Sequence, residues 1–271
     1  MTPAFPAPAW LVGCGNMAGA MVEGWRKGGI DFSDVTVIRP SGTMVEGVKT
    51  VTDYPAAEAP RFVMLGFKPQ KLDEVAPGLT PHVGAECVVV SMLAGVSAVT
   101  LRERFRHAKA IIRVMPNLPV AQAQGMTAIY SAEGRQELLA DIGRLIASLG
   151  MVVWCRKEEE LGVIGAIASA GIAYVARFAA ALAKSGEALG MRPGEAEQVA
   201  IQTLVGTAAY ASDTGLSVTE IARRVASPRG TTEQGLAVLD AEDGLQQLVN
   251  RTIEAAVRRS KELAAEAAQR N

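Results

Sequence analysis

A glycine turn near the start of the chain has the residue types and spacing of a phosphate-binding site. Residues 9–25 read AWLVGCGNMAGAMVEGW, with the pattern G-x-G-x-x-A from Gly13 to Ala18. Gly13 permits a tight turn, Gly15 lets the backbone approach a pyrophosphate because it has no Cβ, and Ala18 is small enough for a helix to pack on the preceding strand. The free N–H groups at the helix start would bind phosphate. The alternative is a tight strand-to-helix turn without a ligand, but the position near the N-terminus favours a dinucleotide.

The residues after the second expected strand indicate which dinucleotide is bound. In enzymes that use NAD, an Asp or Glu near the end of this strand binds the ribose 2′-OH. The strand expected at Val35–Ile38 is preceded by two aspartates and followed by RPSGT at 39–43. A cation, Arg39, and the two hydroxyls of Ser41 and Thr43 suit a 2′-phosphate, so the sequence predicts NADPH in preference to NADH. The alternative is that Arg39 is a solvated loop charge.

Short apolar runs alternate with helical patterns as far as Trp154, which predicts a mostly parallel sheet with helices on both faces. Ligands of such sheets bind at the carboxyl ends of the strands, so the segments that follow the strands should line one crevice. Further strands are expected at Lys49–Thr52, Arg61–Phe67, Glu86–Met92, Ala110–Val114, Thr127–Tyr130 and Met151–Trp154, and helices after Pro69, at Val99–Phe105 and at Arg135–Leu149.

The chain becomes all-helical after Trp154, so we expect an α/β domain of the Rossmann type at 1–157 and a helical domain at 158–271. Small residues dominate the second domain, which favours close helix packing and a dimer interface. The apolar stretch 163–183 is interrupted by Arg177, which favours a buried interface helix over a membrane span. Helices are expected at Glu158–Gly190, Pro193–Ser212, Val218–Val225 and Ala241–Gln269.

Composition excludes several classes of protein. The 271 residues include 27 Lys and Arg and 28 Asp and Glu, a net charge of −1, so no basic surplus favours nucleic acid or an anionic membrane. The histidines, His82 and His107, are isolated, so no metal site is expected. Cys14, Cys87 and Cys155 lie far apart, as reduced thiols of a cytoplasmic protein would. The opening MTPAFPAPA has no signal-peptide pattern and is expected to be a flexible leader.

A second stretch with chemical potential reads SPRGTTEQGL at 227–236. Thr231 and Gln234 resemble a capping box, which would place the N–H groups of Gly230, Thr231 and Thr232 at a helix N-terminus. That geometry binds a carboxylate, and a threonine hydroxyl adds a neutral donor and acceptor. Taken alone, the stretch is more readily explained as an ordinary capped helix start.

Taken together, these stretches resemble the pyrroline-5-carboxylate reductase family over nearly the whole chain. The most specific combination is a Ser-Pro-x-Gly-Thr-Thr element with a Met-Pro-Asn element. The matching segments are GCGNMAGAMVEGW at 13–25, FKPQ at 67–70, Ala94–Gly95, RVMPNLPV at 113–120 and ASPRGTTEQGL at 226–236.

The resemblance implies a Rossmann domain, a helical domain that interlocks two subunits, and reduction of the C=N bond of 1-pyrroline-5-carboxylate to L-proline by NADPH, sometimes NADH. It implies that Gly230, Thr231 and Thr232 hold the substrate carboxylate, with Thr232 near the ring nitrogen as the catalytic residue. Glu158 matches an acidic residue near the substrate. The cofactor contacts implied are Gly13, Cys14, Gly15, Asn16, Met17, Ala18, Lys68 and Pro69, with Ser41 at the adenosine phosphate and Ala94, Gly95 and Asn117 around the nicotinamide.

Two departures from the family pattern bear on the substrate. The family's usual Ser-Gly-Ser-Gly-Pro-Ala-Tyr run is ASAGIAY at 168–174, and Arg229 replaces a usual glycine. These changes leave two alternatives open. One is a related reductase of imines or 2-hydroxyacids, and the other is a non-catalytic NADPH sensor.

Overall fold

The computed structural model describes residues 3–56, 59–133 and 136–269, and the side chains among them except at 136–138, 264 and 266–269. Its contacts divide the chain into two compact units, Met1–Ser169 with Val257–Asn271, and Ala170–Ala256. The sequence-based boundary at 157/158 stays a prediction. The first unit holds the sheet, and the second is helical throughout its described residues.

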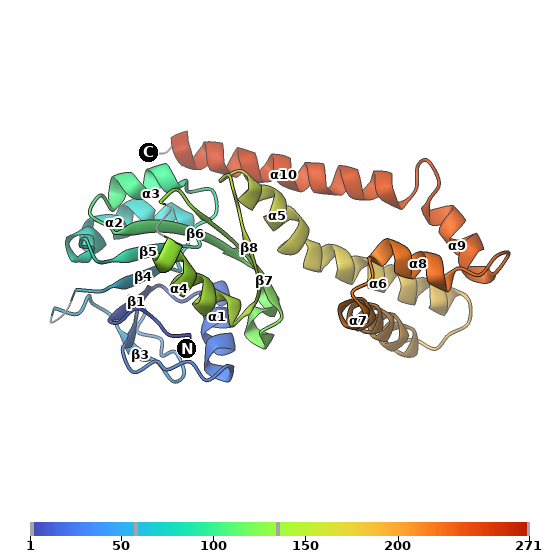
Figure 1. The fold of residues 1–271 in the computed structure, drawn as a ribbon, viewed down its shortest axis with the longest axis horizontal. Helices are drawn as coiled ribbons and strands as arrows, with labels where there is room; N and C mark the ends of the chain where they lie inside the picture. The colour runs from blue at the N-terminus through green and yellow to red at the C-terminus, as the bar shows by residue number, and fades with distance from the viewer. Residues whose placement is uncertain (1–2, 57–58, 134–135, 270–271) are drawn as a thin grey trace. The chain divides into compact units, whose positions relative to one another are not determined.

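The centre of the first unit is one eight-stranded sheet (Figure 1). Its strands lie in the order β3-β2-β1-β4-β5-β6-β7-β8. All neighbours are parallel except β6 and β7, so the prediction of a mostly parallel sheet is confirmed. The strands are β1 (Ala9–Val12), β2 (Val35–Ile38), β3 (Lys49–Val51), β4 (Phe62–Leu65), β5 (Val88–Ser91), β6 (Ala110–Pro116), β7 (Gly125–Ser131) and β8 (Gly150–Trp154).

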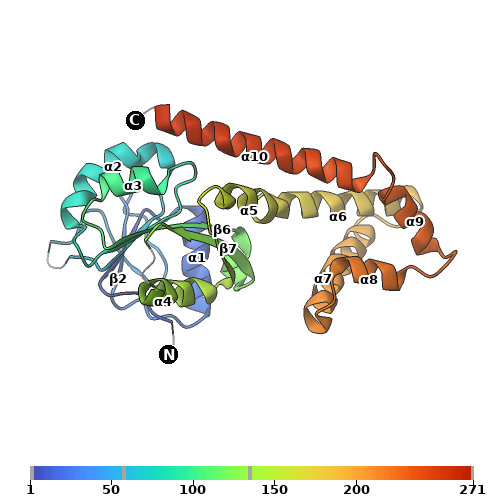
Figure 2. The same cartoon turned by 45° about the horizontal axis from the view of Figure 1, so that its top comes forward.

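Helices cover both faces of this sheet (Figure 2). Alternate side chains of each central strand enter separate apolar clusters, because successive residues of a strand point to opposite faces. Leu11 joins residues of α1 and α4, whereas Trp10 and Val12 join residues of α2 and α3. The helices of this unit are α1 (Asn16–Lys27), α2 (Leu72–Leu79), α3 (Ala98–Arg104), α4 (Gln136–Ala147), α5 (Glu160–Ala168) and the second half of α10 (Leu245–Gln269). Arg135, where the fourth was expected to begin, lies outside the described residues.

The prediction of a flexible leader is wrong for the described residues at the start of the chain. Phe5 is 8% exposed and belongs to the cluster under α1 and α4. Its ring centroid lies 5.0 Å from that of Trp25 and 5.4 Å from that of Phe62. Burial of an aromatic ring contributes about 1.5–3 kcal/mol, enough to hold the segment on the sheet.

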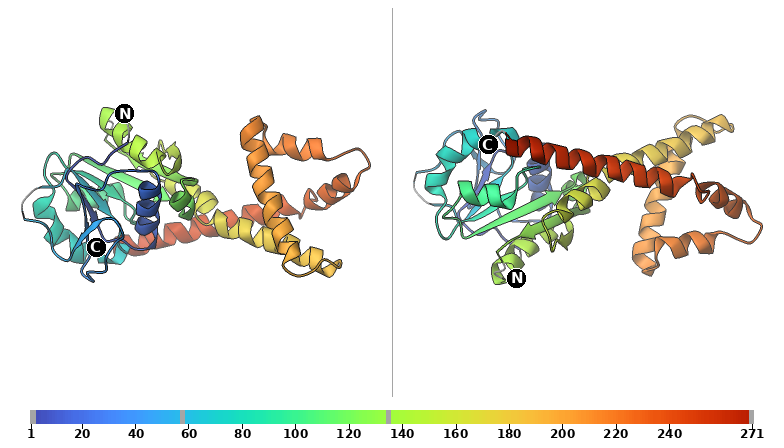
Figure 3. Two further views of the ribbon diagram at one scale, coloured as in Figure 1. Left: turned by 90° about the horizontal axis from the view of Figure 1, so that it is seen from below. Right: turned by 90° about the horizontal axis from the view of Figure 1, so that it is seen from above.

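The second unit contains α6 (Gly171–Ala188), α7 (Glu195–Thr214), α8 (Val218–Val225), α9 (Thr231–Leu239) and the first half of α10 (Leu245–Gln269). Helices α6 and α7 cross each other (Figure 3) through a small cluster of alanines. Ala179 and Ala183 of α6 meet Ala196 and Ala200 of α7. The small side chains allow close packing, as the Ala-rich composition predicted.

The single helix expected at Glu158–Gly190 is two helices, because α5 ends at Ala168 and α6 begins at Gly171. The amide of Asn117 donates to the carbonyl oxygen of Ala168 at 3.0 Å, and the Ser169 hydroxyl donates to that of Pro116 at 3.3 Å. The chain between α5 and α6 is therefore hydrogen-bonded to the end of β6 and the residue after it, at the point where the helix is interrupted. Such contacts leave no local sequence signal.

The stretch from α5 through α6 is the one candidate membrane span among the described residues, judged by length and composition alone. Its apolar window has a mean hydropathy of 1.7 and is 22% buried. Two features argue against a continuous span, namely the turn at Ser169 and Ala170 and the charge of Arg177 within α6. An interface with another protein chain explains the exposed apolar side chains equally well.

Candidate dinucleotide site

The glycine turn between β1 and α1 has the close backbone approaches that its sequence predicts. Gly13 has a φ of 76°, a left-handed conformation that favours glycine, and its N–H donates to the carbonyl oxygen of Ile38 at 2.8 Å. A Cβ on Gly13 would lie 2.9 Å from the carbonyl oxygen of Gly66. Ala18 is 1% exposed, as expected for a helix packed on the sheet.

Gly66 contacts this turn from the end of β4, and its role was not predicted from the sequence. It follows β4, and a Cβ built on it would lie 2.9 Å from both the Ala18 Cβ and the Gly13 carbonyl oxygen. Glycine is therefore required on both sides of the contact between the two strand ends. The available signal was a glycine directly after the buried run Phe62–Leu65.

The N-terminus of α1 fits the pyrophosphate of a dinucleotide. The N-cap is Gly15, which supplies no side-chain hydrogen bond, and the first turn carries no acidic residue. The first N–H groups of a helix lack partners within the helix, so those of Asn16, Met17 and Ala18 are suited to phosphate oxygens. The Cβ of an alanine at Gly15 would lie 3.8 Å from the nearest protein atom, so the bare backbone there is not required by the fold.

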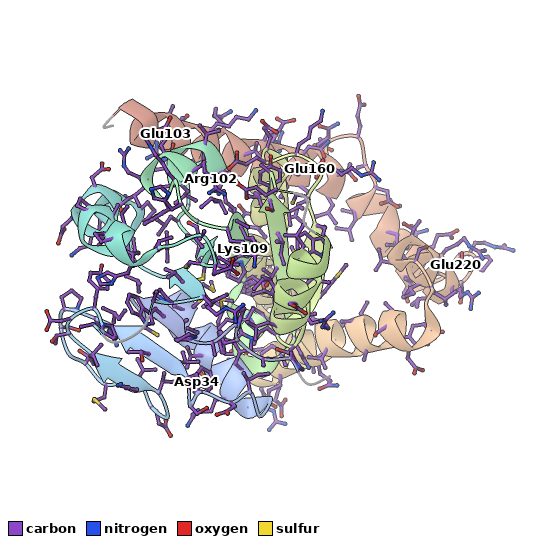
Figure 4. The ribbon with its side chains drawn as sticks, turned by 60° about the vertical axis from the view of Figure 1, so that its left-hand side comes forward. Asp34, Arg102, Glu103, Lys109, Glu160 and Glu220 are labelled. Atoms are coloured by element: carbon purple, nitrogen blue, oxygen red, sulfur yellow. The ribbon has the colours of Figure 1, made fainter. Side chains whose placement is uncertain are left out.

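The end of β2 carries a cation and hydroxyls where a ribose phosphate would lie. Arg39 donates from Nη1 to the Thr43 carbonyl oxygen at 3.2 Å, and the hydroxyls of Ser41 and Thr43 lie 3.0 Å apart. Asp34 lies at the opposite, amino end of β2 (Figure 4), where its carbonyl oxygen accepts from the N–H of Ala9 at 2.9 Å. No carboxylate therefore takes the NAD-type position directly after the strand.

Arg39 also acts electrostatically on the glycine turn. Burial raises the pKa of the Cys14 thiol, and the positive charge of Arg39 partly opposes that rise. The positive charge of Arg39 is therefore felt at Cys14, within the glycine turn that is expected to bind phosphate. A raised pKa keeps the thiol neutral near neutral pH, which disfavours a role as a nucleophile.

The loops after β4 and β5 present the other expected cofactor residues at the same strand ends. Lys68 is exposed and precedes a short 3₁₀ turn that starts at Pro69. In the next loop, Ala94 is exposed and Gly95 has a φ of 78°. These residues form the tips of their loops, where a ligand can reach them.

Asn117 and Glu158 have polar partners within the protein. Asn117 is 8% exposed, donates to the Ala168 carbonyl oxygen at 3.0 Å and accepts from the N–H of Met126 at 2.8 Å. The Oε1 atom of Glu158 accepts from Arg113 and from the N–H of Ala98. Their expected roles at the nicotinamide and the substrate stay predictions.

The expected carboxylate-binding residues lie in the second unit, at the start of α9. The N-cap is Gly230 and Thr231 is the first helical residue, so the prediction that Thr231 and Gln234 form a capping box is wrong. Instead, Oε2 of Glu233 accepts from the N–H of Arg229 at 2.6 Å. Because a glycine caps the helix, its first N–H groups receive no side-chain cap.

Arg229 adopts a glycine-like conformation in this loop, with a φ of 58°. The left-handed region costs a residue with a Cβ on the order of 1 kcal/mol. The loop therefore keeps the backbone form that suits the family's usual glycine, although it carries an arginine side chain.

A mostly parallel sheet covered on both faces, with a glycine turn after its first strand that is suited to phosphate, indicates a dinucleotide-dependent oxidoreductase. No group of three His, Cys, Asp or Glu side chains is arranged for a metal ion in the part of the chain that the structure describes. Residues 158–263 match the family model for pyrroline-5-carboxylate reductase dimerisation, and residues 10–95 match that of the F420-dependent NADP oxidoreductases.

Similar proteins cover nearly the whole chain. Pyrroline-5-carboxylate reductase 3 of Macaca fascicularis is 31% identical over 93% of this chain and 94% of its own. The Pseudomonas aeruginosa reductase is 29% identical over 94% of this chain and 96% of its own. The solved structure of the Coxiella burnetii reductase superposes with a TM-score of 0.87 at 29% identity, covering 96% of this chain and 99% of its own. The chain belongs to the pyrroline-5-carboxylate reductase family.

Proposed function

We propose that this protein reduces 1-pyrroline-5-carboxylate to L-proline with NADPH. The observation that carries the proposal is the glycine turn before the uncapped start of α1, with Arg39 and Ser41 after β2, in a chain that is similar to these reductases over 93% of its length. The matched NADP oxidoreductase model supports the choice of dinucleotide. NADPH is used in the last step of proline biosynthesis, and NADH is expected to be a poorer donor.

Bound NADPH supplies a hydride for the imine carbon. The N–H groups of residues 16–18 hold the pyrophosphate, and Arg39 and Ser41 hold the 2′-phosphate. Lys68 and Pro69 flank the phosphates, while Ala94, Gly95 and Asn117 surround the nicotinamide end. These residues bind and orient, and much of the rate comes from holding the two reacting carbons close together.

The start of α9 is proposed to hold the substrate carboxylate. The N–H groups of Thr231 and Thr232 carry the positive end of the helix dipole, which stabilises an anion, whereas the N–H of Gly230 donates to the Ser227 carbonyl oxygen at 2.9 Å. Thr232 is half-buried, so its hydroxyl is suited to orient the ring nitrogen or to relay a proton to it. A protonated nitrogen makes the imine carbon a better hydride acceptor.

The protein is proposed to act as a soluble cytoplasmic homodimer or a larger assembly of dimers. The matched family model describes dimerisation and spans the helical part of the chain. Apolar side chains on α6 are exposed in the single chain, including Val175, Phe178 and Leu182. Their spacing places them on one helix face, which a second subunit would cover.

The test is NADPH oxidation by the purified protein with 1-pyrroline-5-carboxylate, with NADH in parallel and NADPH binding measured separately. Fast oxidation that is stronger with NADPH supports the proposal. Turnover with another cyclic imine or a 2-hydroxyacid alone would show the related reductase. NADPH binding without turnover on any of these substrates would show a sensor.

A further inference from the structure

One carboxylate oxygen of Glu158 joins three separate segments of the first unit. Its Oε1 atom accepts from the N–H of Ala98 at 2.6 Å and from Nη1 of Arg113 at 2.7 Å. Ala98 is the first residue of α3, and Arg113 belongs to β6. The side chains of Arg113 and Glu158 are only 11% and 22% exposed, so their interaction is largely protected from solvent.

Arg113 stands at the base of the loop that follows β5. The strand register pairs it with Ser91, the last residue of β5. Its Nε atom is buried and has no hydrogen-bond partner in the described part of the chain. Glu158 is therefore the carboxylate that balances this cation, and removing it would leave a largely buried charge unpaired.

The same loop carries two of the proposed nicotinamide contacts. Leu93 and Val96 are 1% and 5% exposed and anchor the loop in the core, while Ala94 between them is exposed. The loop ends at Ala98, whose N–H is held by Glu158. The apolar side chains fix the middle of the loop, and the carboxylate fixes its end.

We propose that Glu158 and Arg113 are positioning residues that hold loop 93–98 in the form that binds NADPH, and that Glu158 is not a substrate contact. The inference rests on the proposed placement of the nicotinamide against Ala94 and Gly95. It assigns to Glu158 a role in cofactor binding that differs from the role implied by family resemblance.

Two substitutions of Glu158 test the hydrogen bonds that its carboxylate accepts. Glu158→Ala removes the acceptor for both Ala98 and Arg113, whereas Glu158→Gln keeps an oxygen at the same reach. Glu159→Ala is the matched control, because this neighbour is exposed and makes no side-chain cap at the start of α5.

The measurements are the NADPH dissociation constant without substrate and hydrogen exchange of residues 93–100 in the cofactor-free protein. We expect Glu158→Ala to weaken NADPH about tenfold or more, the size expected for loss of a hydrogen bond to a charged group, and to speed amide exchange in the loop. Glu158→Gln keeps an acceptor oxygen but loses the charge opposite Arg113, so its NADPH affinity should fall between those of wild type and Glu158→Ala, and Glu159→Ala should match wild type. The KM for the imine at saturating NADPH should change little in all three.

The proposal is overturned if folded Glu158→Ala keeps the NADPH affinity of wild type and its rate of amide exchange in the loop. It is also overturned if only the KM for the imine rises, because that result would mark Glu158 as a substrate contact. If Glu158→Ala does not fold, the double variant Glu158→Ala/Arg113→Met removes both charges and is measured instead. The double variant must also weaken NADPH if the proposal is correct. The NADPH dissociation constant and the amide exchange are measured without turnover, so a failure of the proposed reaction stays distinguishable from a failure of this proposal.

Discussion

Replacing Gly15 by alanine tests the dinucleotide site without disturbing the fold. Gly15 has a φ of −76° and a ψ of −168°, a conformation that alanine adopts without strain. The added Cβ would lie 3.8 Å from the Gly66 carbonyl oxygen, an ordinary van der Waals contact. The lower entropy of the unfolded chain and the poorer N-cap roughly cancel, so stability should change by less than about 1 kcal/mol.

The effect on NADPH should be much larger, because the methyl group occupies the surface that a pyrophosphate approaches. Loss of one hydrogen bond to a charged group costs about 1.5–3 kcal/mol, which corresponds to about 10- to 160-fold in the dissociation constant. Calorimetric titration of the variant with NADPH measures this change directly.

Gly13→Ala provides the comparison, because there the fold itself requires glycine. The left-handed φ of 76° and the 2.9 Å approach to the Gly66 carbonyl oxygen should together cost about 2 kcal/mol or more of stability. Urea midpoints of the two variants measure the difference. The interpretation of the turn is refuted if Gly15→Ala binds NADPH like wild type, or if it loses as much stability as Gly13→Ala.

Four further predictions follow from single features of the structure. Arg39→Ala should raise the KM for NADPH about tenfold or more and leave the KM for NADH unchanged, as measured by steady-state kinetics. An equal rise in KM for both cofactors would contradict a contact between Arg39 and the 2′-phosphate. Thr232→Ala should lower kcat and leave the NADPH dissociation constant unchanged, and unaltered turnover would remove Thr232 from the mechanism. Phe178→Asp should shift the dimer towards monomer in light scattering, whereas Lys184→Asp on an exposed position should not. Burial raises the pKa of the Cys87 thiol from 9.0 to about 12, so the stability that comes from its neutral form is complete below pH 9 and is lost as the pH rises towards 12. Above pH 9 the urea midpoint of wild type should therefore fall more steeply with pH than that of Cys87→Ala. Parallel slopes for the two proteins would refute this prediction.

The strands and the glycine turn could be predicted because their signals are local. Phe62–Leu65 is entirely apolar, Val35–Ile38 is apolar except for Thr36, and the structure buries every residue of both. A strand buried on both faces has no polar side, so sequence alone identifies it. The G-x-G-x-x-A spacing places its small residues by the same short-range geometry, and Gly13 takes the predicted turn.

The roles of Asn117 and Glu158 could not be predicted from their own neighbourhoods. Asn117 bonds to Ala168, 51 residues further along, and Glu158 bonds to Ala98, 60 residues back. The sequence marks both as polar residues near a strand end or a helix start, and family resemblance places both near ligands. Only the folded chain shows that their polar atoms hold other segments in place.

The sequence by itself predicted the strands of the sheet and the glycine turn after the first of them, because each depends on residues within a few positions of one another. Tertiary structure decided where α5 breaks from α6, how the loop after β5 is held, and why Gly66 must be glycine. In each of these three cases, segments far apart in the sequence are joined by a hydrogen bond or pack closely against each other. Such partners are chosen by the packing of the whole unit, and spacing along the chain does not reveal them.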